Sequence, residues 1–276
     1  METVLCVLHD EDMMEKLVCL QNEVYLKRGL HFTKDVFRHW YIDNPDGPAI
    51  SSSAFDGEKM IAHVSLEPEK MLVDGQIVNC VRAMAGVSHP DYRGNRLLSK
   101  LSNIAIEEAA RQGYSFVYGL ANGNSFPGLV RYCGYSFITR LNVMMGFGTE
   151  IHEDGEKTYR RYWSEDALAW RFSQGKYRKM GNCVLGQFRT GVETYMGTLP
   201  SQSQVQISDN NNYKPLFPQL KLYVGLGAKL PWSYVKVPKF IKHSPFNLIF
   251  QDLSGGKLPM MTKDNLFYQL MDFDVA

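Results

Sequence analysis

The stretch from His89 to Leu101, HPDYRGNRLLSKL, combines residues that suit the binding of an anion such as a phosphate. Arg93 and Arg96 carry guanidinium groups, which form charge-assisted hydrogen bonds to phosphate oxygens. Gly94 lies between them and permits backbone conformations that other residues resist. The apolar run that follows predicts a helix, whose first backbone N–H groups lack partners and favour negative charge. The alternative is an ordinary strand-to-helix loop with two solvated arginines.

A second group of polar residues lies in IAHVSLEP, which has the composition of a strand. His63, Ser65 and Glu67 are two residues apart, so they share one face of that strand. Three polar side chains on one face are unusual in a hydrophobic core. Two interpretations stay open: the face is solvated, or it contributes to a functional site.

Helices are expected at the start of the chain. Apolar residues at helical spacing predict a helix over residues 11–29. Thr33 is a suitable N-cap for a second helix that continues through Trp40. Pro45 and the residues after it then interrupt the helical pattern.

A sheet is expected to follow. Residues 50–90 read as three antiparallel strands, because Asp56-Gly57 and Asp74-Gly75 are hairpin-turn pairs. A helix from about Arg96 to Gln112 comes next, with Gly113 in a position to end it. This helix is long enough to join two parallel strands, the second being YSFVYGLA.

The second half of the chain repeats one feature of the first. Trp170 lies in a short predicted helix followed by a polar break and a hairpin, in the same order as the segment around Trp40. This single match favours a duplication without establishing it. We therefore predict two domains, residues 1–150 and residues 151–276.

The order of elements and the stretch VRAMAGVSHPDYRGNRLLSKL resemble the GNAT superfamily of acyl-CoA-dependent acyltransferases. In that family a strand offers backbone groups to the pantetheine arm, and the loop (Gln/Arg)-x-x-Gly-x-(Gly/Ala) binds the pyrophosphate of coenzyme A. The chain departs from this pattern at Arg96 and Leu98, where the family has small residues. The resemblance implies that the acyl-CoA contacts are Ala85, Gly86, Val87, Arg93, Gly94, Asn95, Arg96, Leu97, Leu98 and Asn124.

A second stretch, FVYGLANGNSFPGLVRYCGYSF, supports the same resemblance. The family shows an Asn after a strand, then a short helix and a closing Gly-Phe. Asn122 or Asn124 corresponds to that Asn, and Gly134-Tyr135 corresponds to the closing pair. The family's usual Tyr, which protonates the departing thiolate, falls on Val130 here. Tyr132 lies two residues further on and would project differently from a helix.

The resemblance implies that an amine attacks a thioester, which requires a base and a polarised carbonyl. The main chain at Ala85 to Val87 is the expected partner of that carbonyl. Glu67 and His63 are the candidate catalytic residues. The terminal carboxylate of Ala276 is a further candidate base, because some tandem enzymes of this type use theirs.

The predicted fold is a GNAT-like α/β fold: a mixed, mostly antiparallel sheet flanked by helices, followed by a second, degenerate GNAT-like half. The predicted function is an N-acyltransferase that uses acetyl-CoA or another acyl-CoA and acts on an amine of a small molecule such as an amino sugar. Two alternatives are a non-catalytic acyl-CoA-binding or regulatory module, favoured by the missing Tyr, and an acyltransferase acting on an aminoacyl or peptide precursor.

Composition limits the partners that we expect. The 30 basic and 29 acidic residues give a net charge of +1, which argues against a nucleic-acid partner. The five cysteines show no CxxC pair, so no metal site is expected. The N-terminus lacks the features of a signal peptide, and no apolar stretch approaches the roughly 20 residues that span a bilayer. We therefore expect a cytoplasmic protein with no membrane span, for which a homodimer is one possible state.

Overall fold

The computed structural model describes residues 2–6, 10–25, 29–84, 86–187, 192–207, 217–238 and 245–273. The chain forms two compact units. Unit 1 consists of Met1–Lys70, Val78–Phe137 and Asn247–Pro259, and unit 2 consists of Met71–Ile77, Ile138–Phe246 and Met260–Ala276. Neither unit is a continuous stretch of chain. The division into residues 1–150 and 151–276 stays a prediction about two homologous halves, and the compact units have different bounds.

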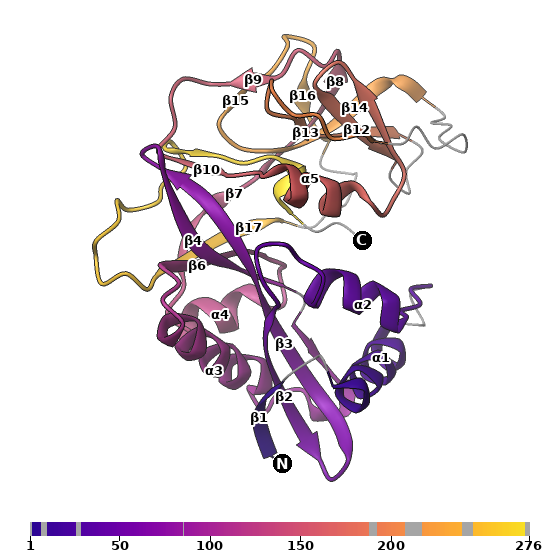
Figure 1. The fold of residues 1–276 in the computed structure, drawn as a ribbon, viewed down its shortest axis with the longest axis vertical. Helices are drawn as coiled ribbons and strands as arrows, with labels where there is room; N and C mark the ends of the chain where they lie inside the picture. The colour runs from indigo at the N-terminus through magenta and orange to yellow at the C-terminus, as the bar shows by residue number, and fades with distance from the viewer. Residues whose placement is uncertain are drawn as a thin grey trace. The chain divides into compact units, whose positions relative to one another are not determined.

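Two helices follow the first strand of unit 1, and the sequence predicted both of them (Figure 1). Helix α1 spans Glu11–Tyr25 and buries Met14, Leu17 and Leu20. Helix α2 spans Lys34–Tyr41, and the Thr33 hydroxyl accepts a hydrogen bond from the Val36 amide. This cap satisfies one of the N–H groups that a helix start leaves without a partner.

The sheet of unit 1 contains the three antiparallel strands that the sequence predicted. In order along the sheet, its strands are β1 (Glu2–Cys6), β2 (Ile50–Asp56), β3 (Lys59–Val73), β4 (Gln76–Ala83), β6 (Phe116–Ala121), β17 (Asn247–Asp252) and β7 (Ser136–Arg140). Asp74 and Gly75 both have positive φ angles, which a tight hairpin turn requires. Strands β4 and β6 run parallel, as the long connecting helix implied. Strands β1 and β17 were not predicted.

Helices α3 (Leu97–Arg111) and α4 (Phe126–Tyr132) follow β4 and β6. Leu97 and Leu101 of α3 pack against Ala62 and Val64 of β3. The alternate residues of β3 point to the opposite face, where the ring of His63 stacks on Tyr41 of α2 at 6.0 Å. Strand β3 therefore separates an α3 side from an α2 side within unit 1 (Figure 1).

Unit 2 contains a six-stranded sheet and one described α-helix, α5 (Glu165–Phe172). The sheet has the order β11 (Tyr177–Met180), β12 (Cys183–Gln187), β13 (Val192–Thr198), β14 (Phe217–Gly225), β8 (Asn142–Phe147) and β16 (Val235–Lys236). The remaining short elements are β9 (His152–Glu153), β10 (Tyr159–Arg161), β15 (Ala228–Lys229), β18 (Leu266–Phe267) and η3 (Leu270–Asp272). The predicted mixed α/β class, with sheets flanked by helices, is confirmed.

Candidate active site

Strands β4 and β6 stop pairing at Ala83 and Gly119. Beyond this point β6 continues to Ala121 and pairs with β17. On the other side, β5 (Val87–Ser88) pairs with β3, opposite His63 and Ala62. In the described part of the chain, therefore, no ladder joins β5 to β6, and the sheet opens between them.

The backbone turns irregular at the mouth of this opening. The Met84 amide donates to the Ser65 carbonyl at 2.9 Å, and the His89 amide donates to the Ile61 carbonyl at 2.8 Å. Because amides alternate in direction along a strand, the Ser88 amide points away from β3 and into the opening. Of the three predicted main-chain contacts, Gly86 is exposed, Val87 is buried, and Ala85 lies outside the described residues.

The loop after β5 leads into α3 through two residues with positive φ. A short 3-10 turn, η2, spans Pro90–Tyr92, and Gly94 (φ 86°) and Arg96 (φ 54°) follow. A Cβ at Gly94 would meet nothing within 4 Å, so the surface beside the loop is open. Arg96 is the N-cap residue and makes no side-chain cap. Consequently the first amides of α3 are available to an anion.

The residues predicted to bind the phosphates differ in their exposure to solvent at the start of this helix. Arg93, Gly94, Asn95 and Arg96 are exposed, and Leu97 is buried in the core. The Asn95 side chain donates to the Tyr92 carbonyl at 3.2 Å. Leu97 can therefore contribute only its backbone.

Leu98 occupies a position where the GNAT pattern has a small residue, and Gly86 explains how the larger side chain fits. A Cβ built on Gly86 would lie 3.5 Å from Leu98 Cδ2. The glycine therefore leaves the room that Leu98 occupies. Leu98 packs on the α3 side of β3, and its backbone amide remains at the helix start.

Asn122 and Asn124 have separate roles. The Asn122 side-chain oxygen accepts hydrogen bonds from the amides of Asn124 and Ser125, at 2.9 and 3.0 Å, and so shapes the turn into α4. Asn124 is exposed, and its side chain makes no hydrogen bond to the described residues. Asn124 therefore stays the candidate for contact with acyl-CoA.

Val130 and Tyr132, at and near the position of the family's usual Tyr, have different surroundings. Val130 packs against the core of unit 1. The side chain of Tyr132 lies at the surface, where the guanidinium of Arg96 stacks on its ring at 4.5 Å. Arg96, the second departure from the GNAT pattern, is thus in contact with the displaced tyrosine.

The polar face of β3 is buried. His63, Ser65 and Glu67 are each at most 1% exposed, so the interpretation of a solvated face is wrong. Ser53 and Ser65 each place a hydroxyl within hydrogen-bond distance of one His63 ring nitrogen, at 2.8 and 2.7 Å. Burial lowers the pKa of His63 to about 3. The imidazole is therefore neutral with both nitrogens engaged, which argues against direct contact with a substrate.

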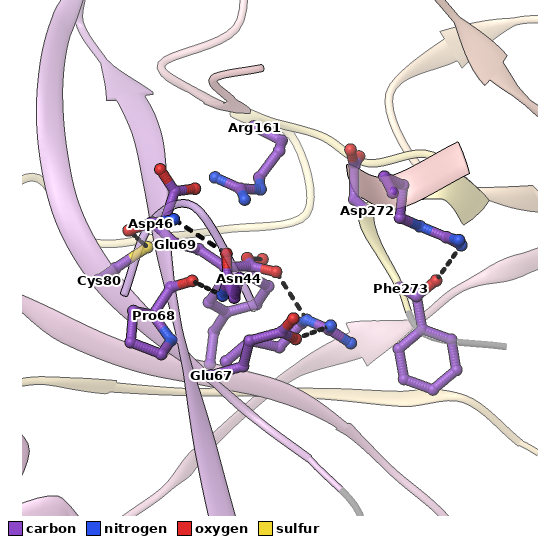
Figure 2. A network of polar contacts seen from close by, with 12 residues as sticks. Asn44, Asp46, Glu67, Pro68, Glu69, Cys80, Arg161, Asp272 and Phe273 are labelled. Atoms are coloured by element: carbon purple, nitrogen blue, oxygen red, sulfur yellow. Dashed lines mark hydrogen bonds and ion pairs between the residues drawn. The ribbon is translucent and has the colours of Figure 1, made fainter. Parts of the chain in front are cut away.

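Glu67 belongs to a buried ionic network (Figure 2). Arg82 donates from one terminal nitrogen to Glu67 and from Nε to Glu69, the latter at 2.7 Å. The Tyr118 hydroxyl donates to the second oxygen of Glu69. Glu69 was not among the predicted site residues, although it continues the two-residue spacing of His63, Ser65 and Glu67 along β3. Tyr118 was not predicted either, because β6 has the sequence of an ordinary buried strand and gives no local signal.

The opening and the ionic network are adjacent along β3. The Ser65 carbonyl binds the Met84 amide at the mouth of the opening, and Glu67 is the next residue on the same face of β3. That face points away from α3. Glu67 therefore lies on the face of β3 opposite α3, where its carboxylate is buried beside Arg82.

Unit 2 contains a separate cavity of about 450 Å³. Trp163 and Phe267 contribute to its walls, and the Trp163 indole donates to Asp272 at 2.9 Å. Asp272 also accepts from the Gln269 amide at 2.7 Å. The volume of this cavity and its aromatic lining are typical of pockets that bind small molecules. Its lining comes from segments far apart in sequence, so no local motif indicated it.

Ala276, the third candidate base, lies outside the described residues. Within the described ranges, no group of three or more potential metal ligands occurs. Among the same residues, no helix reaches the length and apolar character needed to traverse a lipid bilayer.

Comparison with known proteins agrees with this geometry. Residues 9–138 match the model of the family described as an acetyltransferase (GNAT) domain. This match covers just under half of the chain, and it makes residues 9–138 similar to a GNAT acetyltransferase domain. The match supports the expectation of an acyl-CoA-dependent N-acyltransferase. None of the curated protein sequences matches this chain closely enough to count as a relative.

Solved structures extend the likeness of fold to almost the whole chain. A probable N-acyltransferase from Enterococcus faecalis is 11% identical, with a TM-score of 0.60 over 92% of this chain and 73% of its own. A GCN5-related N-acetyltransferase from Kribbella flavida is 9% identical, with a TM-score of 0.57 over 92% and 73%. A third, from Anabaena variabilis, is 10% identical, with a TM-score of 0.56 over 91% and 73%. At these identities the likeness concerns the fold.

Proposed function

We propose that this protein transfers an acetyl group from acetyl-CoA to the amine of a small molecule by direct attack within a ternary complex. The observation that carries the proposal is the opening between β5 and β6, with an uncapped helix start on one side and the Glu67 carboxylate on the other. Acyl-CoA supplies a thioester and a set of phosphates, and this arrangement has a complementary group for each.

The residues at the start of α3 fit a pyrophosphate. The amides of Leu97, Leu98 and Ser99 are at the first turn of the helix, and Arg93 adds a guanidinium without an acidic partner in the described chain. The open surface beside Gly94 admits the phosphates close to the backbone. The amides of Gly86 and Ser88 are assigned to the pantetheine arm and the thioester carbonyl, with Asn124 beside them.

We assign the general base to Glu67. The amine nitrogen attacks the thioester carbon, its proton goes to Glu67, the C–S bond breaks, and the thiolate leaves. Arg82 holds the carboxylate in place and favours its ionised form, which is the form that accepts a proton. His63 is assigned a structural role, since its buried hydrogen bonds fix the spacing of β2 and β3 next to the site.

The acceptor belongs to the class of small amines, for example an amino sugar. If the acceptor amine approaches Glu67, the carboxylate attracts its ammonium group and can then take its proton. The second candidate function is a non-catalytic acyl-CoA-binding module. Val130 in place of the usual Tyr favours this alternative, because the departing thiolate then lacks that acid.

Calorimetry with acetyl-CoA, followed by a thiol-release assay over a panel of amines, tests the proposal. We expect saturable binding of acetyl-CoA and release of free thiol with at least one small amine. Binding without thiol release on any amine, including aminoacyl and peptide amines, would support the non-catalytic module. Absence of binding would overturn the assignment of the opening to acyl-CoA.

A further inference from the structure

Three arginines in unit 1 differ from the other arginines that the structure describes. Arg93, Arg96 and Arg131 are exposed and have no carboxylate partner among the described residues. By contrast, five described arginines pair with a carboxylate, namely Arg38, Arg82, Arg111, Arg160 and Arg178, and Arg161 and Arg171 donate to backbone carbonyls. The chain as a whole is balanced in charge, with 30 basic and 29 acidic residues. A local group of unpaired arginines in such a chain indicates a polyanionic ligand.

Two of these arginines meet on one aromatic ring. The Arg96 guanidinium lies 4.5 Å from the centre of the Tyr132 ring, and that of Arg131 lies 5.5 Å from it. The Asn103 side chain donates to the Tyr132 carbonyl at 3.2 Å, which ties the end of α4 to α3. Stacking engages the face of a guanidinium and leaves its in-plane N–H groups free for a phosphate.

The number of donors exceeds what a pyrophosphate requires. The α3 amides and Arg93 already provide for the pyrophosphate in the proposed function. Arg96 and Arg131 remain, and a pair of guanidiniums matches a phosphomonoester, which carries nearly two negative charges at neutral pH. The acyl donor has one such group, the 3′-phosphate of its ribose.

We propose that Arg96 and Arg131, held around Tyr132, bind the 3′-phosphate of CoA and thereby select CoA over 3′-dephospho-CoA. The inference rests on the proposed function, because it requires the pyrophosphate to lie at the start of α3. It also gives a joint role to Arg96, which departs from the GNAT pattern, and to Tyr132, which lies two residues beyond the position of the family's usual Tyr. The arginine at position 96 and the tyrosine at position 132 form one contact, and that contact creates the subsite.

Calorimetric titration with CoA and with 3′-dephospho-CoA measures this selectivity directly. The unmodified chain is expected to bind CoA roughly tenfold to a hundredfold more tightly, the range of a charge-assisted hydrogen bond or two. Arg131→Ala and Arg96→Ala are expected to bring the ratio of the two affinities close to one. Arg93→Ala is expected to weaken the binding of both ligands equally and to leave the ratio of the two affinities unchanged.

Matched variants separate this role from general charge and from folding. Lys257→Ala removes one positive charge from an exposed side chain of unit 1 and is expected to change neither affinity. Tyr132→Phe keeps the ring and is expected to keep the ratio, whereas Tyr132→Leu is expected to lower it. Arg131 is exposed, so its replacement leaves the fold intact even if Arg96→Ala is unstable.

The outcomes distinguish the two proposals. Equal binding of CoA and 3′-dephospho-CoA by the unmodified chain would overturn the selectivity and leave the proposed function standing. A ratio that survives both Arg131→Ala and Arg96→Ala would overturn the assignment of these residues. If CoA itself does not bind, the proposed function fails first, and the inference fails with it.

Discussion

Replacing Glu67 by Gln tests the assignment of the general base, and Glu69→Gln is its matched control. Both carboxylates lie on β3, both are almost fully buried, and both accept hydrogen bonds from Arg82. Each substitution removes one negative charge from the same guanidinium, while the other carboxylate remains. Because Arg82 keeps one ionic partner, we expect each variant to lose about 1–3 kcal/mol of unfolding free energy, less than for a buried pair broken completely.

Their activities should differ. Removal of a general base lowers turnover by about 10²- to 10⁴-fold, so Glu67→Gln should fall in this range while Glu69→Gln stays near the unmodified enzyme. Urea denaturation measures the loss of stability, thiol release measures turnover, and calorimetry should show unchanged affinity for acetyl-CoA in both variants. Turnover of Glu67→Gln within about threefold of Glu69→Gln would refute the assignment of the base.

Three further predictions concern His63 and two glycines. The folded-state pKa of His63 is about 3, below its usual value of 6.5, so the unfolded chain takes up a proton that the folded chain does not. The stability contributed by neutral His63 is complete above pH 6.5 and falls as the pH drops, by about 2 kcal/mol at pH 5. Urea titrations should therefore show that the unfolding free energy depends less steeply on pH in His63→Gln than in the unmodified chain. Equal slopes in the two proteins would contradict the buried neutral imidazole. In NMR titrations, the His63 ring should show no protonation between pH 8 and pH 5, whereas a midpoint near 6.5 would mean that it is solvated. A Cβ at Gly119 would lie 2.9 Å from the Ala83 Cβ. Gly119→Ala should therefore push β4 away from β6 and lower the free energy of unfolding by about 1–3 kcal/mol. The control Gly128→Ala meets only Ser99 Oγ at 3.5 Å and lies within α4, so it should be neutral or stabilising in the same denaturation assay; equal losses in the two variants would contradict the close strand contact.

Local signals in the sequence sufficed for several elements in the first half of the chain. Periodicity gave α1, α2 and α3, and the Asp-Gly pairs gave the hairpins of β2, β3 and β4, because these features depend on neighbouring residues alone. The parallel pairing of β4 and β6 followed from the length of the connecting helix. Strand β17 joins β6 from more than a hundred residues away, and no local pattern specifies such a pairing.

The candidate site was only partly predictable for the same reason. The loop from Arg93 to Leu98 is continuous in sequence, so its residue types indicated an anion site directly. Glu69 and Tyr118 come together through Arg82 from three strands, and their contact exists only in the folded sheet. The burial of His63 also depends on helices that cover the sheet, and the alternating pattern of β3 was therefore compatible with a solvated face.

Hydrogen exchange of the backbone amides, measured with and without acetyl-CoA, tests the central claim that the donor occupies the opening and the start of α3. We expect exchange to slow at Gly86 and Ser88 and at Leu97, Leu98 and Ser99, while exchange of the β2 amides far from the opening is unchanged. If acetyl-CoA binds by calorimetry and exchange at both segments stays as it is in the free protein, the donor binds elsewhere and the proposed site is wrong.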